Sequence, residues 1–208
     1  SPYVTWEQRM LYKQYDAMRE GRYSATARQF YTGNASMLRS VLDECGGFDP
    51  DFRRAEDVEL GYRLADAGIA FNFVRGAEAY HFAERSFEGW LEIASSYGRN
   101  DVIFWRDRAQ SWLVPQIRFE WESRHRLNRA FTRLGVGVPL VGKLIEVITR
   151  PVVERGSRRN PEFGQRLLSA VYGLRYYSAL ADELGSLQTF LDMDPDSEPG
   201  DHAAPPFS

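Results

Sequence analysis

Four short motifs between Phe30 and Phe82 decide the fold prediction: FYTGNASM (30–37), CGGFDPDF (45–52), AEDVELGYRL (55–64) and AEAYHF (77–82). They place two adjacent acids, a histidine and several glycines at the ends of short alternating elements. Ligand sites in α/β folds form at such positions, where strands end and helices begin. The prediction of function therefore depends on this stretch.

The apolar spacing around these motifs predicts short strands packed with helices. Spacings of three and four residues, with stop signals at glycines, predict helices at residues 4–21, 36–44 and 56–68. Short extended runs predict strands at residues 29–32, 69–74 and 77–82. Gly33 and Asn34 both tolerate positive φ, so a sharp turn is expected after the first strand. The expected fold class is α/β.

Glu56 and Asp57 stand at the start of the predicted third helix, and two readings of them are open. Acids favour helix N-termini because the dipole and the unpaired N–H groups stabilise negative charge. A carboxylate aimed into a cleft at the mouth of a sheet can instead serve as a general base. Spacing alone does not separate these readings, and His81 is similarly open as a core group, a cap or a ligand.

The order of GGFD (46–49), EDVELGYRL (56–64) and Tyr80-His81 resembles the acceptor-side half of family 2 glycosyltransferases with the GT-A fold. The resemblance covers about residues 6–107. It implies a partial GT-A-like fold in which Asp57, beside Glu56, deprotonates the acceptor hydroxyl while the anomeric carbon of a nucleotide sugar is attacked with inversion. The resemblance also makes His81 a candidate ligand for a divalent metal, manganese in preference to magnesium because histidine is a ligand.

The same resemblance implies the substrates and the residues that contact them. The donor is a nucleotide sugar, and the acceptor is a glycan or a lipid-linked glycan. Asn34 lines the cleft in relatives, and Gly33, Gly47 and Arg54 are the further candidates for substrate binding.

One departure from the family pattern limits the expected activity. The nucleotide-binding half, with its Asp-x-Asp metal motif, would precede residues 4–21, and these 208 residues do not contain it. Asp192-Met193-Asp194 matches the motif in spelling only, because no apolar strand precedes it. We expect an inverting glycosyltransferase fragment that is inactive without the other half.

Beyond the motifs, composition predicts a helical region and an acidic tail. The expected domains are residues 1–108 (acceptor and catalytic-base half), 109–190 (helical region) and 191–208 (disordered tail). Residues 123–160 hold nine Lys or Arg against two Glu, together with an apolar helix between Pro139 and Pro151. Such a segment either packs internally or lies on an anionic membrane surface.

Composition also excludes several classes of protein. The net charge of −3 argues against nucleic acid as a partner, and the single Cys45 excludes an internal disulfide. No signal peptide or 18-residue uncharged apolar segment is present in the sequence, so a cytoplasmic location is expected, peripheral to the inner face of the plasma membrane if residues 123–160 bind lipid.

Two other functions remain open. A non-catalytic module derived from a glycosyltransferase would bind a sugar, a membrane or a partner subunit. A hydrolase would use two carboxylates, for which Asp57 and Glu59 are the candidates.

Overall fold

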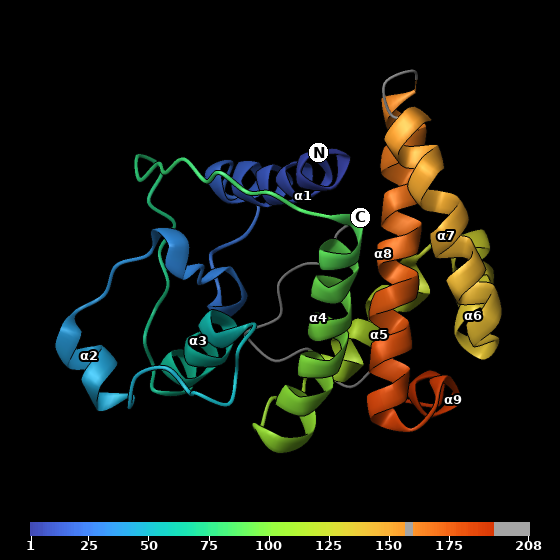
Figure 1. The fold of residues 1–208 in the computed structure, drawn as a ribbon. Coiled ribbons are helices and arrows are strands. Elements are labelled where there is room, and N and C mark those ends of the chain that lie inside the picture. The colour runs from blue at the N-terminus through green and yellow to red at the C-terminus, as the bar shows by residue number, and fades with distance from the viewer. Residues whose placement is uncertain (157–159, 194–208) are drawn as a thin grey trace. The chain divides into compact units, whose positions relative to one another are not determined.

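A computed structural model describes residues 1–156 and 160–193 of the chain. In chain order these residues form α1 (Pro2–Arg19), the 3-10 helices η1 (Ala27–Gln29) and η2 (Thr32–Asn34), α2 (Arg39–Glu44), α3 (Glu56–Asp66), α4 (Phe87–Asp107), α5 (Leu113–Ser123), α6 (Arg126–Gly137), α7 (Pro139–Gly156), α8 (Pro161–Leu184) and α9 (Leu187–Leu191) (Figure 1). Within these ranges no helix has the length and apolar character needed to cross a membrane.

The predicted α/β class, with a partial GT-A-like fold, is wrong for the residues that the structure describes, because they form helices and no strand. Residues 69–74 and 77–82 form no ladder, and a strand requires a neighbour for its N–H and C=O groups. Phe71 and Phe73, two residues apart in the predicted strand at residues 69–74, make aromatic contacts instead of facing a sheet. Phe71 packs on Phe30 with ring centroids 5.8 Å apart, and Phe73 stacks on Tyr15 at 6.0 Å.

Two of the predicted helices are confirmed. The expected helices at residues 4–21 and 56–68 correspond to α1 and α3. Pro151 was expected to end a helix, but it lies inside α7. The predicted disordered tail begins at residue 191, where α9 ends, and from residue 194 onward it lies outside the described residues.

Contacts divide the described residues into two compact units. One unit holds residues 1–10 and 83–193, and the other holds residues 11–82. The domain boundaries predicted at residues 108 and 190 stay predictions.

In the first unit, α8 lies beside α4, α6 and α7 (Figure 1). Trp90 of α4 is fully buried, and its ring meets Trp6 edge-on at 5.3 Å and Tyr172 of α8 at the same distance. A second aromatic group joins Trp121, Tyr177 and Phe190, all of them buried. Large aromatic rings therefore supply much of the buried apolar surface that holds these helices together.

Glycines let the helices of this unit approach closely. A Cβ on Gly98 of α4 would stand 2.2 Å from the Tyr176 carbonyl oxygen of α8. A Cβ on Gly135 of α6 would stand 2.5 Å from the Leu174 side chain, and one on Gly142 of α7 would stand 2.7 Å from the Gly135 carbonyl oxygen. At Gly98 and Gly142 a Cβ would meet the backbone of the neighbouring helix, and at Gly135 it would displace the Leu174 side chain.

The second unit is built on α3. Leu60 and Leu64 are buried against Phe30, with Met37, Val41, Leu42, Cys45 and Phe71 partly buried around them. A Cβ on Gly61 would stand 2.7 Å from the Ala27 carbonyl oxygen, so glycine is what lets α3 pack on η1.

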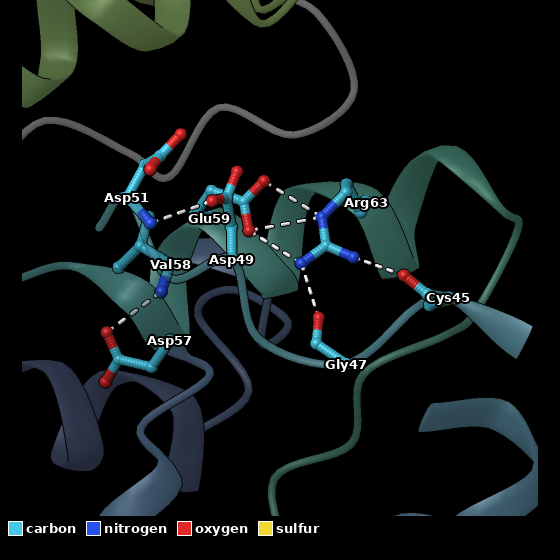
Figure 2. A network of polar contacts seen from close by, with 8 residues as sticks. All are labelled: Cys45, Gly47, Asp49, Asp51, Asp57, Val58, Glu59 and Arg63. Atoms are coloured by element: carbon cyan, nitrogen blue, oxygen red, sulfur yellow. Dashed lines mark hydrogen bonds and ion pairs between the residues drawn. The ribbon is translucent and has the colours of Figure 1, made fainter. Parts of the chain in front are cut away.

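An ion pair on α3 holds the loop that contains the CGGF residues, as Figure 2 shows. The guanidinium of Arg63 donates to both oxygens of Glu59, at 2.7 to 3.1 Å, and Glu59 has only 3% of its side chain exposed. The same guanidinium donates to the carbonyls of Cys45 and Gly47, the latter at 2.7 Å. Gly47 has φ +70°, a conformation that favours glycine. We call this set the Arg63 clasp.

We expect Gly98→Ala to destabilise the protein, because the new methyl group meets backbone that cannot rotate away. Overpacking of this kind costs about 1–3 kcal/mol in unfolding free energy, measurable by urea denaturation. Gly137→Ala is the control, since a Cβ there meets nothing within 4 Å. Equal stability of the two variants would contradict the close approach of α4 and α8.

We expect Arg63→Ala to lower the unfolding free energy by about 3 kcal/mol, because it removes the cation of Arg63 from the buried Glu59 carboxylate. Urea denaturation followed by circular dichroism measures the loss. Arg39→Ala removes the exposed pair of Arg39 with Asp43, at 3.6 Å, and should cost less than about 0.5 kcal/mol. Matching losses for the two variants would rule out a special role for the clasp.

Candidate functional site

The candidate site lies at the N-terminus of α3, where the backbone is strained. Ala55 precedes the helix as its N-cap, with φ 59° and ψ 24°, and is buried. Left-handed backbone costs an L-residue other than glycine about 1–2 kcal/mol. Ala55 also has no side-chain oxygen to cap the first amides of the helix. The start of α3 is therefore determined by its surroundings and not by a local capping motif.

Asp57 occupies the first turn of this helix and is partly buried. Its Oδ1 accepts a hydrogen bond from the Val58 amide at 2.9 Å (Figure 2). Burial is the largest influence on the carboxyl and raises its pKa, and the neighbouring charge of Glu56 raises the pKa further. Backbone amides of Val58 and Thr32 lower it, but the net direction is upward. The carboxylate thus binds a proton more tightly than an ordinary aspartate.

The backbone hydrogen bond from Thr32 to Asp57 shows that the TGN turn lies beside Asp57. Thr32, Gly33 and Asn34 form η2, a single 3-10 turn whose residues are exposed. The turn predicted at Gly33 and Asn34 forms as this 3-10 turn, but neither residue has positive φ. A Cβ on Gly33 would meet nothing within 4 Å, so the packing of the described residues does not require glycine at this position.

Asn34 connects this turn to the AEAYHF segment. Its side-chain amide donates to the Ala77 carbonyl at 2.9 Å, across 43 residues of sequence. Three of the four sequence motifs therefore converge, from Asp57 through Thr32 and Asn34 to Ala77. The fourth, CGGFDPDF, is held to α3 by the Arg63 clasp.

His81 lies at the far end of that segment and is exposed, as are its neighbours Tyr80 and Phe82. Across residues 1–156 and 160–193, no group of three or more His, Cys, Asp or Glu side chains is arranged to hold a metal ion. The donor set expected around a manganese or magnesium ion is thus not supplied by the side chains that the structure describes.

The other predicted contact residues have different surroundings. The carbonyl of Gly47 accepts a hydrogen bond from Arg63, and its φ of +70° accounts for glycine at this position by structure alone. Arg54 is exposed and directly precedes Ala55, while Glu56 is partly buried beside Asp57. The structure places Glu56, Asp57 and Arg54 in one short segment at the start of α3, with Gly33 and Asn34 on the neighbouring turn.

Sequence reasoning missed the Arg63 clasp and the strain at Ala55. Glu59 and Arg63 are four residues apart on a helix, and this spacing is enough to predict their pairing. The strain had no signal in the sequence, because alanine rarely adopts positive φ. The clasp also removes Glu59 from the two-carboxylate hydrolase reading, since its carboxylate is buried and paired with Arg63.

Comparison with known proteins finds short local similarity. Over 56 residues, 26% of this chain, the sequence is 41% identical to a chondroitin synthase from Pasteurella multocida (strain Pm70) and 41% identical to a hyaluronan synthase from Pasteurella multocida. Over the same length it is 43% identical to a chondroitin synthase from Escherichia coli. No family model matches the chain, and no solved structure matches it.

The match covers a small part of each relative. The 56 residues correspond to 6% of the length of each Pasteurella protein and 8% of the Escherichia coli protein. The similarity indicates a relationship to glycosyltransferases over about a quarter of this chain.

Proposed function

We propose that this chain is the acceptor-side and catalytic-base part of an inverting glycosyltransferase of family 2, in which Asp57 is the general base. The observation that carries the proposal is the partly buried Asp57 carboxylate, with its raised pKa, at the point where the TGN turn meets α3. The local similarity to chondroitin and hyaluronan synthases supports the reaction class.

A sugar hydroxyl is a poor nucleophile at neutral pH, so a base must accept its proton as the new bond forms. Asp57 takes the proton on its carboxylate while the hydroxyl oxygen attacks the anomeric carbon and the nucleoside diphosphate leaves. A raised pKa makes Asp57 a stronger base at neutral pH, and such a group contributes about 10² to 10⁴ in rate. Glu56 assists because its negative charge raises the proton affinity of Asp57.

The substrates follow from the same proposal. The donor is a nucleotide sugar, and the relatives' names, chondroitin synthase and hyaluronan synthase, make a glycan the acceptor to test first. Asn34 and Gly33 are proposed to border the acceptor, since their turn is exposed beside Asp57. Gly47 and Arg54 stay predicted substrate contacts.

The divalent metal, manganese or magnesium with His81 as ligand, also stays a prediction. Such an ion would neutralise the leaving diphosphate. The described side chains near His81 do not form a cluster that fits it, so we assign no step to it.

The alternative is a non-catalytic module that binds a sugar, a membrane or a partner subunit. A measurement of glycosyl transfer distinguishes this module from the proposed enzyme. The cytoplasmic location, peripheral to the inner face of the plasma membrane, is likewise a prediction.

In the full-length product of the gene, Asp57→Asn should lower kcat by about 10² to 10⁴ while acceptor binding is kept, because the amide cannot accept the proton. Transfer from nucleotide-sugar donors to a glycan acceptor measures the rate, and calorimetry measures acceptor binding. Asp51→Asn, which neutralises an exposed acid of the same unit, is the control and should leave kcat unchanged. Undiminished turnover in Asp57→Asn would exclude Asp57 as the base.

The raised pKa of Asp57 also predicts how stability depends on pH. The pKa of Asp57 is higher in the folded state than in the unfolded state, where it is about 3.9, so protonation favours the folded state. This stabilisation is complete below the unfolded pKa and is lost as pH rises through the folded pKa. Asp57→Asn should therefore gain stability relative to the unaltered protein between pH 4 and pH 7, measured by urea denaturation at both values. A relative loss over that range would show that the folded protein prefers the ionised form.

A further inference from the structure

Large apolar side chains lie on the solvent side of α7. Leu140, Leu144, Val147 and Ile148 are between 56% and 78% exposed, and Val152 is 40% exposed. Their spacings of four, three, one and four residues place them on one side of the helix. The buried side of α7 carries Gly142, Thr149 and Val153 instead.

The preceding helix has the same arrangement. On α6, Leu127 and Leu134 are 72% and 55% exposed, while Thr132 and Gly135 are buried. The small inner residues let the two helices meet at Gly135 and Gly142. We define the outer α6–α7 surface as Leu127, Leu134, Val138, Leu140, Leu144, Val147, Ile148 and Val152.

The charges beside this surface are positive. Residues 126–156 contain two acids, and both are engaged: Glu146 pairs with Arg175 and has 14% of its side chain exposed, and Glu154 accepts from Arg150 and from the Tyr3 hydroxyl. Arg126, Lys143 and Arg155 are exposed and make no ion pair with the described residues.

We propose that the outer α6–α7 surface binds the face of an anionic lipid bilayer, with its leucines, valines and isoleucine in the acyl boundary and Arg126, Lys143 and Arg155 at the headgroups. An amphipathic helix with aliphatic residues on one side and cations beside them lies in the interface plane in this way. A soluble protein rarely leaves so many large apolar side chains together in water.

Charge decides between a bilayer and a second copy of the chain. Two copies joined through this surface would bring their own cations together, and like charges across an interface cost several kcal/mol. An anionic bilayer attracts each of them, by about 1 kcal/mol per Lys or Arg near the surface.

The test is co-sedimentation of the full chain with two kinds of vesicle. One kind is phosphatidylcholine alone, and the other is phosphatidylcholine with about one third phosphatidylglycerol. We expect binding to the anionic vesicles and little to the neutral ones. Lys143→Gln/Arg155→Gln should lower the partition coefficient about fivefold per cation removed. Leu140→Gln/Leu144→Gln/Ile148→Gln should lower it at least about tenfold, because each leucine contributes more than 1.4 kcal/mol on burial.

The control is Leu38→Gln, which removes a leucine of matched exposure, 71%, that lies outside this surface. It should bind as the unaltered chain does. Far-UV circular dichroism confirms that each variant is folded, since glutamine is compatible with a helix. Equal binding to both kinds of vesicle, or full binding by the triple variant, overturns the proposal. A third outcome also overturns it: the unaltered chain does not bind vesicles but forms a dimer in sedimentation equilibrium, and the triple variant is a monomer.

Discussion

The ion pair of Glu59 with Arg63 is the interaction on which the candidate site depends. A carboxylate with 3% of its side chain exposed is stable only with a cation beside it and its remaining lone pairs satisfied. Arg63 supplies both the charge and a planar fork of donors, and the same fork reaches the carbonyls of Cys45 and Gly47. The pair therefore positions a loop as well as neutralising a charge. Because Asp57 lies two residues before Glu59, whatever holds α3 in place also places Asp57.

Helix geometry gives the two carboxylates different roles. At 100° per residue, Asp57 and Glu59 point to nearly opposite sides of α3, so Arg63 neutralises one and leaves the other. Asp57 is left with backbone amides as its partners, and burial and the charge of Glu56 then raise its pKa. Of the acids in the EDVEL motif, Glu59 is thus a structural residue and Asp57 is the candidate base.

The parts of this picture that were predictable from sequence are those set by local periodicity. α1 and α3 follow from apolar spacings of three and four residues, and the pairing of Glu59 with Arg63 was open to the same reasoning. The strands failed because alternation at Phe71 and Phe73 does not distinguish a sheet from single aromatic contacts, here with Phe30 and Tyr15. The surroundings of Asp57 depend on Thr32, 25 residues earlier, and strain at Ala55 is a property of the folded backbone that composition does not encode.

The helices α6 and α7 reverse the usual pattern of a soluble helix pair, in which leucines face inward and small or polar residues face water. Here the inner sides carry Thr132 and Gly135 of α6 and Gly142, Thr149 and Val153 of α7, and the close approach at Gly135 and Gly142 leaves no room for a side chain at those two positions. The leucines lie on the outer side, where covering them would contribute about 25 cal/mol of hydrophobic free energy for each Å² removed from water. Arg126, Lys143 and Arg155, which are exposed and make no ion pair with the described residues, favour an anionic cover. The side of α7 that carries Gly142 is therefore the observation from which we propose a membrane-surface role for the opposite side.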